Sequence, residues 1–134
     1  MGRAIHFEIA AKIPARAVDF YQRAFGWDVN SWDGPGEYWL ATTGPDTMPG
    51  INGAIMQGDN PQVVLTIDVK DLDMAAKTIV ESGGKTLTEP SEVMNVGMFR
   101  YCEDTEGNKF GIMQAFTPLE QRQMSAMSAM EETS

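Results

Sequence analysis

The sequence contains the tripeptide Ile-Met-Gln twice, at residues 55–57 and again 57 positions later at 112–114. A second pair of segments, HFEIAAKIPARAVDFYQRAFGW from His6 and VLTIDVKDLDMAAKTIVESGGK from Val64, aligns without a gap at an offset of 58. An internal repeat restricts a chain to architectures built from two copies of one unit. We therefore expect a single domain over residues 1–116 made of two repeats, 4–58 and 62–116, followed by a tail over 117–134.

The first repeat predicts one helix among four strands. The segment AIHFEIA alternates apolar with polar or small residues, which is typical of a half-buried strand. A helix then begins near Pro14 and ends at Gly26, because proline suits a first helical turn and glycine a helix end. Strands are predicted near 27–32, 37–42 and 51–57, separated by the turns DGPG and GPDTMPG.

The second repeat predicts the same order of elements. The strand QVVLTIDV precedes a helix that Asp71 or Asp73 can cap and that runs through Val80. Strands near 85–89, 97–102 and 108–115 follow. The fold class is therefore α+β, with two tandem β-α-β-β-β modules. Since one helix covers only one face of each four-stranded sheet, we expect the two modules to face each other around a cavity.

Composition excludes several classes of partner and location. A net charge of −9 without a Lys/Arg run argues against nucleic acid and against anionic membrane surfaces. No apolar run approaches the ~20 residues of a membrane-spanning helix, and the N-terminus lacks a signal-peptide pattern. We therefore expect a cytoplasmic protein. The single cysteine, Cys102, can form no internal disulfide and is expected to pack as a small residue.

The tail differs from the rest of the chain in composition. Met124, Met127 and Met130 recur at every third residue, which would give a short helix one apolar stripe. A frayed terminus and a helix that packs on this chain or on a partner subunit are both compatible with this pattern.

Several segments resemble the vicinal oxygen chelate superfamily, which includes glyoxalase I, bleomycin-resistance proteins and extradiol dioxygenases. These segments are HFEI, AVDFYQRAFGW, WDGPGEYWL, TTGPD, GINGAIM and EDTEGNKFGIMQ. They are similar to a branch of small bacterial glyoxalase-related proteins, and the resemblance extends over residues 4–116. It implies paired β-α-β-β-β modules and a small-molecule ligand. It also implies a divalent metal in many members, bound by His and Glu side chains that project from the first and fourth strands of each module.

This resemblance places the metal ligands at His6 and near Ala54, Val64 and Gly111. Alanine, valine and glycine supply no ligand atom, and one imidazole does not hold a divalent cation specifically. Glu8 shares the strand face of His6, so a two-ligand site is conceivable but incomplete. We therefore predict no cofactor and no standard metal site.

Strand alternation also selects candidate site residues. His6 and Glu8 are the catalytic candidates, because a carboxylate two residues from a histidine can orient the ring or act as a base. They could equally form a polar pair that closes the cavity without catalysis. The predicted ligand contacts are Met56, Thr66, Asp68 and Met113.

Other polar and aromatic residues have less specific interpretations. Arg100 is a candidate anion contact only if its face is inward. Six aromatic residues suit either ordinary packing or the walls of a ligand cavity: Trp27, Trp32, Trp39, Tyr38, Phe99 and Tyr101.

Three functions follow from these observations. The first is a small-molecule-binding protein of unassigned substrate without the standard metal site. The second is a lyase or isomerase that acts on a vicinal-oxygen substrate through His6 and Glu8. The third is an interaction module, since repeats of this kind make edge-strand pairing and a homodimer plausible.

Overall fold

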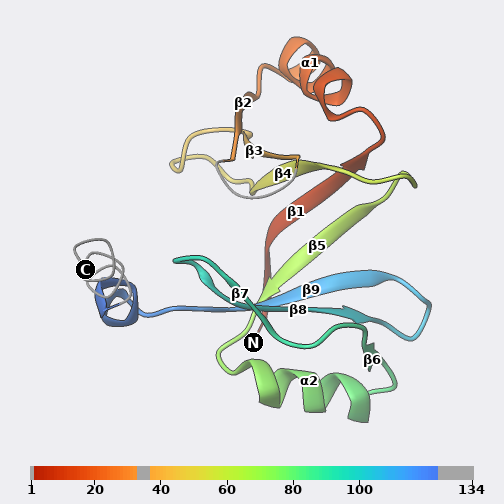
Figure 1. Cartoon of the computed structure of the whole chain (residues 1–134), viewed down its shortest axis with the longest axis vertical. Coiled ribbons are helices and arrows are strands. Elements are labelled where there is room, and N and C mark those ends of the chain that lie inside the picture. The colour runs from red at the N-terminus through yellow and green to blue at the C-terminus, as the bar shows by residue number, and fades with distance from the viewer. Residues whose placement is uncertain (1, 33–36, 124–134) are drawn as a thin grey trace, which may run out of the picture. The chain divides into compact units, whose positions relative to one another are not determined.

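The computed structural model describes residues 2–32 and 37–123 (Figure 1). The chain divides into two compact units, an N-terminal unit of Ala4–Thr66 and a C-terminal unit of Ile67–Ser134 together with Met1–Arg3. Elements follow in the order β1 (Arg3–Ala11), α1 (Pro14–Phe25), β2 (Asp28–Ser31), β3 (Tyr38–Thr42), β4 (Asn52–Gln57), β5 (Val63–Asp68), α2 (Leu72–Glu81), β6 (Lys85–Thr86), β7 (Ser91–Val93), β8 (Gly97–Glu103) and β9 (Lys109–Ala115). The predicted α+β class is confirmed.

The N-terminal unit is a mixed sheet with the strand order β2-β3-β4-β1-β5. β1 pairs with β4 in parallel, and β4 pairs with β3 antiparallel. Ala54 on β4 lies opposite Glu8 on one side and Leu40 on the other. Because directly opposed residues point to the same side of a sheet, Glu8 and Ala54 share one face, and Ile9 and Ile55 share the other.

Helix α1 covers the face that carries Ile55. Ile55 packs with Val18 of the helix and with Val29 and Ala41 of β2 and β3, and all four are buried. Figure 1 shows α1 beside these strands. The face that carries Glu8 and Ala54 is therefore the one that α1 leaves uncovered; we call it the open face.

The ends of α1 follow from two residues of the sequence. Pro14 occupies the first turn, and Gly26 ends the helix in the left-handed conformation with φ 73°. The Gly26 N–H donates to the Gln22 carbonyl at 3.0 Å, which closes the last turn. Both predicted boundaries are confirmed.

In the C-terminal unit the strand order is β5-β9-β8-β6, and β7 also pairs with β8. Helix α2 packs Leu72 and Ala76 against Cys102 of β8 and Ile112 of β9. Cys102 is fully buried, which confirms its predicted packing role, and burial raises the pKa of its thiol. The Asp71 carboxylate caps α2 by accepting from the Met74 N–H at 3.0 Å.

The two units share one detail of register. Tyr38 lies opposite Met56 in the N-terminal unit, and Phe99 lies opposite Met113 in the C-terminal unit. The order in which strands neighbour one another is also equivalent. It is β1-β4-β3-β2 in one unit and β5-β9-β8-β6 in the other. The internal repeat of the sequence stays a prediction.

The strand predicted over 85–89 is wrong in its extent. It ends at Thr86, and a separate strand β7 follows that the sequence did not indicate. The Leu87 and Thr88 N–H groups both point to the Tyr101 carbonyl, at 2.9 and 3.4 Å, so two residues oppose one as in a bulge. Pro90 then offers no N–H to continue the ladder.

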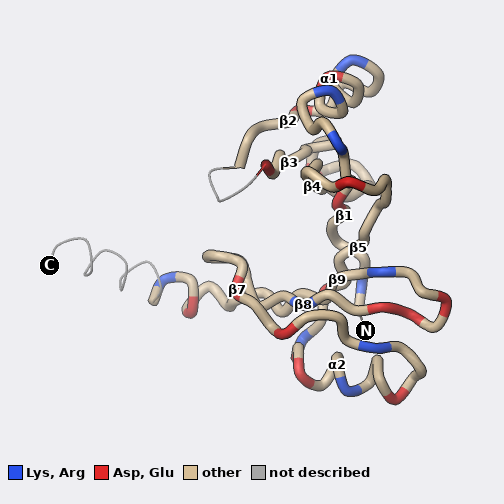
Figure 2. The backbone as a smooth tube through the Cα atoms, turned by 45° about the vertical axis from the view of Figure 1, so that its right-hand side comes forward, with Lys and Arg blue, Asp and Glu red and all other residues tan. Residues whose placement is uncertain are grey.

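Acidic residues gather in the turn between β8 and β9, as the red segments of Figure 2 show. Asp104 accepts from the backbone N–H groups of Glu106 and Asn108 at 2.8 and 2.9 Å. These bonds, with that of the Asn108 side chain, lower the pKa of Asp104. The turn is thus held by its own hydrogen bonds.

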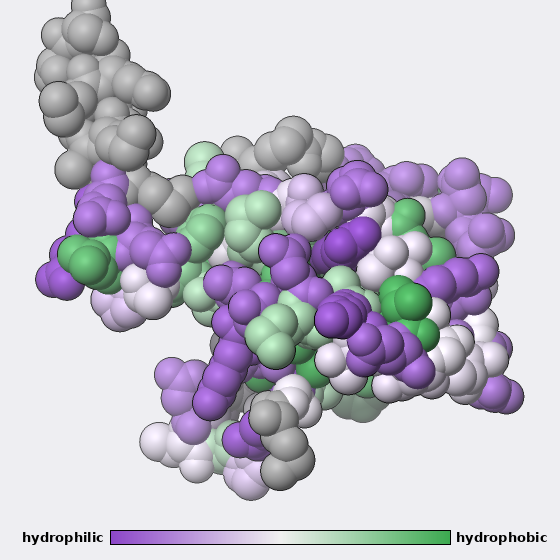
Figure 3. All heavy atoms as spheres, turned by 90° about the horizontal axis from the view of Figure 1, so that it is seen from below, coloured by the Kyte–Doolittle hydropathy of each residue, from purple (hydrophilic) through white to green (hydrophobic). Residues whose placement is uncertain are grey.

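Residues 118–123, the last that the structure describes, are helical, and the Thr117 hydroxyl accepts from the Glu120 N–H at 3.1 Å. The predicted stripe of Met124, Met127 and Met130 lies outside the described residues. On the face of the molecule that Figure 3 shows, hydrophobic residues form small patches that are surrounded by hydrophilic residues. No helix in the described part of the chain is long and apolar enough to span a membrane.

Candidate active site

His6 and Glu8 lie on β1 with their side chains on the open face of the N-terminal unit, and Tyr38 links them. The His6 Nε2 atom lies 3.2 Å from the Tyr38 hydroxyl oxygen. Glu8 acts on the same hydroxyl, because its negative charge adds to the effect of burial in raising the pKa of Tyr38. Glu8 is only 8% exposed. The three side chains form one polar cluster, in which the His6 ring and the Tyr38 hydroxyl are hydrogen-bonded.

Tyr38 reaches this group from a strand that does not touch β1. β4 lies between β1 and β3, and Tyr38 stands opposite Met56, one row beyond Ala54. Two strand spacings amount to about 10 Å, a distance that only a long side chain such as tyrosine spans. The small Ala54 side chain, which is fully buried, leaves room on the open face for Tyr38 to cross β4.

Burial and the charge of Glu8 set the protonation of this group. Burial lowers the pKa of His6, and the nearby negative charge of Glu8 opposes that shift. Burial raises the pKa of Tyr38, and the charge and hydrogen bond of Glu8 raise it further. At neutral pH the site therefore holds a neutral phenol and favours a neutral imidazole.

The other predicted ligand contacts divide between the two units. Met56 is half-buried on the open face beside Tyr38, and Thr66 on β5 is 3% exposed in the same unit. Asp68 and Met113 belong to the C-terminal unit, where the Val69 N–H donates to the Met113 carbonyl at 2.9 Å. The structure thus brings His6 and Glu8 together and places Met56 and Thr66 in their unit.

The aromatic residues prove to have different roles. Trp27 and Trp39 pack against the core under α1. The Trp32 ring meets the Tyr38 ring edge-on, with 5.6 Å between the ring centroids. Phe99 and Tyr101 contact each other on β8 at 4.7 Å. The sequence suggested Tyr38 only as one of six aromatic residues that could line a cavity, and its contact with His6 becomes known only from the strand register and the structure.

The Arg100 side chain is hydrogen-bonded to the backbone of the chain after β6. Its Nε atom donates to the Thr88 carbonyl at 2.6 Å, and the residue is half-buried. The Thr88 hydroxyl accepts from the Tyr101 N–H at 3.0 Å. Arg100 therefore fixes the chain after β6, where the predicted strand breaks off.

The open face does not fit the divalent-metal site that the resemblance implies. His6 and Glu8 supply two donors, and Ala54, opposite Glu8, supplies none. The raised pKa of Tyr38 keeps its phenol protonated, which makes it a poor third ligand. Among the described residues no three His, Cys, Asp or Glu side chains lie close enough together to hold a metal ion.

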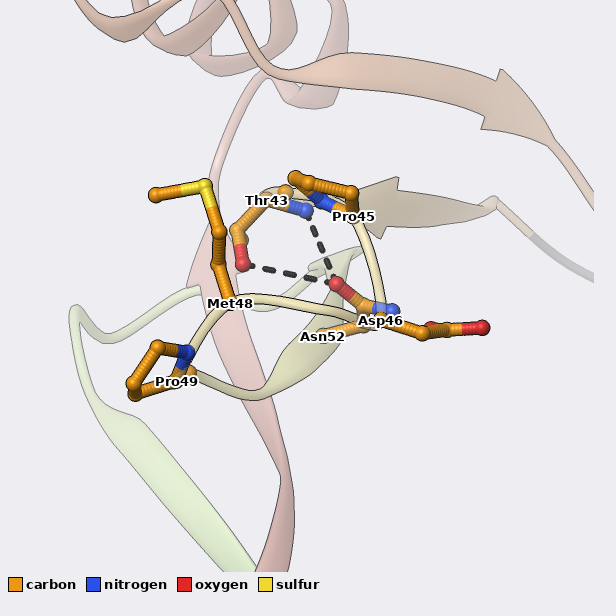
Figure 4. A pocket seen from close by; sticks show the side chains of 8 residues that line it. Thr43, Pro45, Asp46, Met48, Pro49 and Asn52 are labelled. Atoms are coloured by element: carbon orange, nitrogen blue, oxygen red, sulfur yellow. Dashed lines mark hydrogen bonds between the residues drawn. The ribbon is translucent and has the colours of Figure 1, made fainter.

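Two surface pockets of the N-terminal unit are lined by other residues, although the first includes Asn52, which lies opposite His6. One, of about 190 Å³, lies in the β3–β4 loop around Asp46 and Met48, where the Asn52 side chain accepts from the Thr43 N–H at 2.9 Å (Figure 4). The other, of about 350 Å³, lies at the start of α1 beside Lys12 and Arg16. Neither is lined by His6, Glu8 or Tyr38.

Comparison with solved structures shows which folds this chain resembles. The hypothetical protein BH1468 from Bacillus halodurans C-125 matches with a TM-score of 0.69 and 11% identity, over 87% of this chain and 96% of that chain. Methylmalonyl-CoA epimerase from Mycobacterium tuberculosis matches with a TM-score of 0.65 and 16% identity, over 87% and 90%. A variant of the Streptomyces coelicolor methylmalonyl-CoA epimerase, in complex with 2-nitronate-propionyl-CoA, matches with a TM-score of 0.63 and 15% identity. The match covers 86% of this chain and 98% of that chain. At these identities the likeness concerns the fold alone.

A comparison with curated proteins gives no match. The sequence does match the family model of the Glyoxalase/Bleomycin resistance protein/Dioxygenase superfamily over residues 3–112, which is most of its length. The order of strands and helices is β-α-β-β-β in the N-terminal unit, and the C-terminal unit has the same order with β7 as an additional strand. The chain belongs to the glyoxalase/bleomycin resistance protein/dioxygenase superfamily, also called the vicinal oxygen chelate superfamily.

Proposed function

We propose that this chain binds a small organic ligand on the open face of its N-terminal unit, without the standard divalent-metal site. The observation that carries the proposal is the polar cluster of Glu8 and the hydrogen-bonded pair His6 and Tyr38 on the sheet face that α1 leaves uncovered. Buried ionisable groups with shifted pKa values are more frequent at functional sites than elsewhere. Met56 and Thr66, which belong to this unit, remain proposed contacts of that ligand, and Asp68 and Met113 remain proposed ligand contacts of the C-terminal unit by itself.

A screen of neutral, cationic and anionic metabolites by ligand-observed NMR tests this proposal. We expect at least one class to bind, and Tyr38→Phe to weaken that binding. Tyr21→Phe is the matched control, because it removes a hydroxyl from a half-buried tyrosine that stacks on Trp27 on the α1 side. Absence of binding in all three classes, or equal loss in both variants, would contradict the proposal.

The metal part of the proposal has its own measurement. Untagged protein purified without chelator should contain divalent metal well below one ion per chain, because His6 and Glu8 offer too few donors. Near-stoichiometric metal in the wild type that disappears in His6→Ala would show that other ligands complete a site.

A second candidate is a lyase or isomerase, the alternative that the sequence left open. The observation in its favour is a carboxylate, a phenol and a neutral imidazole in mutual contact, which can hold and transfer a proton. The likeness to methylmalonyl-CoA epimerases suggests a first substrate. Methylmalonyl-CoA incubated with the protein in D₂O should gain deuterium at its C2 carbon, and Glu8→Gln should stop the exchange. Unchanged substrate would count against this reaction.

Homodimer formation and a cytoplasmic location also remain proposals. Light scattering of the full chain decides the first, since a monomer at micromolar concentration would contradict it. Fractionation of the producing cell decides the second.

A further inference from the structure

We propose that the pocket at the start of α1 is a second ligand site, which binds a small aromatic carboxylate. All of its lining residues belong to the N-terminal unit, between Ala11 at the end of β1 and Tyr21 of α1. Ala11 packs against the core under α1, whereas Glu8 lies on the open face. The pocket is therefore on the other side of the sheet from the ligand site proposed above and does not depend on it.

A small residue within a row of larger ones forms this pocket. Ile13, Ala17 and Tyr21 are spaced four residues apart, and side chains at this spacing are neighbours on the surface of a helix. The single methyl group of Ala17 thus leaves a gap between two large side chains. The resulting pocket has a volume of about 350 Å³, which is a size typical of small-molecule sites.

The apolar wall of the pocket is exposed but held in place. Ile13 is 50% and Phe20 is 56% exposed, so apolar surface faces water here. The Phe20 ring meets the Tyr21 ring edge-on, with 5.0 Å between the centroids, and the Tyr21 ring stacks on the Trp27 ring at 4.7 Å. Because Trp27 packs against the core, the wall is formed before a ligand binds, which lowers the entropic cost of binding. Such a wall suits an aromatic ring.

The charged residues of the pocket favour an anion. Among the described residues, Lys12 and Arg16 line the pocket and no acidic residue does. Neither of these two side chains forms an ion pair within the described part of the chain, whereas Arg23, further along α1, pairs with Asp19 at 3.4 Å. Two unpaired cations at one pocket are unusual in a chain of net charge −9. A bound anion would neutralise both.

A carboxylate on a small molecule is the anion that fits these observations. The planar guanidinium group of Arg16 can donate two parallel hydrogen bonds to a carboxylate, and Lys12 adds a second positive charge. The net charge of −9 disfavours a nucleic acid or an anionic membrane surface. The ligand would place its aromatic ring against Phe20 and its carboxylate beside Arg16 and Lys12.

A titration of the full-length, nitrogen-15-labelled protein with 2-naphthoate and 2-naphthamide tests this site. The two probes have the same ring system and nearly the same size, and only 2-naphthoate is charged. We expect 2-naphthoate to shift backbone amide resonances of residues 11–21 and to bind about threefold more tightly than the amide, as an exposed ion pair predicts. Absence of binding, or equal binding of both probes, would overturn the proposal.

Variants of α1 show whether the pocket residues are responsible. Arg16→Gln should remove most of the preference for 2-naphthoate. Arg23→Gln is the matched control, because it changes the net charge equally on the same helix but lies outside the pocket. Phe20→Ala should weaken the binding of both probes, whereas Phe25→Ala, at a ring that is 65% exposed outside the pocket, should not. Equal effects within either pair of variants would overturn the proposal.

Two further outcomes distinguish this site from its alternatives. Tyr38→Phe should leave the binding of 2-naphthoate unchanged, because Tyr38 lies on the open face. Amide shifts centred on Glu8 and Ala54 would assign the probe to the open face and would overturn the second site. A peptide that ends in phenylalanine carries the same two groups as the proposed ligand. If it bound more tightly than 2-naphthoate, the occupant would be a protein C-terminus and the assignment to a small molecule would be wrong.

Discussion

The His6 ring and the Tyr38 hydroxyl meet at 3.2 Å although β4 lies between their strands. A contact that crosses a whole strand couples β1 to β3 directly and not only through the ladder hydrogen bonds. It also places one hydroxyl between an imidazole and a largely buried carboxylate. This hydroxyl is therefore important for the stability of the N-terminal unit as well as for its chemistry.

We predict that Tyr38→Phe lowers the free energy of unfolding by about 1 kcal/mol, because the half-buried His6 ring loses its hydrogen-bond partner. Urea denaturation followed by tryptophan fluorescence measures this change. Tyr21→Phe, whose ring stacks on Trp27 at 4.7 Å, should cost much less. Equal effects of the two variants would mean that the Tyr38 hydroxyl contributes little.

Stability should also depend on pH through His6. Burial lowers the pKa of His6 in the folded chain below its ordinary value of 6.5, so the unfolded chain binds more protons in the window between the two values. The free energy of unfolding should therefore be highest above pH 6.5 and should fall as the pH drops through that window. Denaturation midpoints between about pH 5 and 8 measure the slope. His6→Gln should remove this component, and a slope unchanged by the substitution would assign it to other groups.

Adding a donor at position 54 should create a metal site. Ala54 is fully buried opposite Glu8, so Ala54→Glu adds a third donor beside Glu8 and His6, while its larger side chain takes up the room through which Tyr38 crosses β4. Without metal, two adjacent carboxylates should lower the melting temperature. With Mn²⁺ or Zn²⁺ at about 100 times its Kd, metal binding should raise the free energy of unfolding of this variant by about 2.7 kcal/mol.

Ala54→Gln is the control for this variant, because it has nearly the same size and no charge. Metal should stabilise Ala54→Glu more than Ala54→Gln or the wild type, and adding His6→Ala should abolish the difference. Equal responses of the Glu and Gln variants would show that the open face cannot assemble a site.

The sequence predicted β1 and α1 well because their signals are local. Strand alternation around Phe7, Pro14 in the first turn and Gly26 at the end each depend on a few neighbouring residues. The break between β6 and β7 was missed because it depends on how residues 87 and 88 pair with a distant strand. Local patterns carry no information about such pairing.

The candidate site was predictable only in part for the same reason. His6 and Glu8 lie on one strand, so alternation was sufficient to place them on one face. Tyr38 joins them through the register of three strands and through the small side chain at position 54. Neither is visible before the pairing of β4 with both neighbours is known.

Close packing at Gly53 gives a further prediction. Gly53 lies opposite Phe7, and a Cβ atom added at position 53 would overlap the Phe7 ring. Gly53→Ala should therefore destabilise the chain by about 1–3 kcal/mol, since a packed aromatic ring has to move. Gly44→Ala is the control, because no atom lies within 4 Å of its Cβ position. Thermal denaturation of both variants measures the difference.

A double-mutant cycle identifies the cause of this destabilisation. Phe7→Leu shortens the side chain that Gly53→Ala would meet, so the double variant should lose less stability than the sum of the single changes. Additive losses would show that the overlap with Phe7 is not responsible.

The structure shows which of Asp71 and Asp73 caps α2, a choice that the sequence left open. Asp71 accepts from the Met74 N–H, whereas Asp73 lies within the first turn and contributes only through the helix dipole. Asp71→Ala should cost about 1 kcal/mol in urea denaturation, and Asp71→Asn should recover most of it because asparagine also caps. Asp73→Ala should have a smaller effect. If Asp73→Ala were the more damaging change, Asp73 would be the cap and the helix would begin two residues later than Leu72.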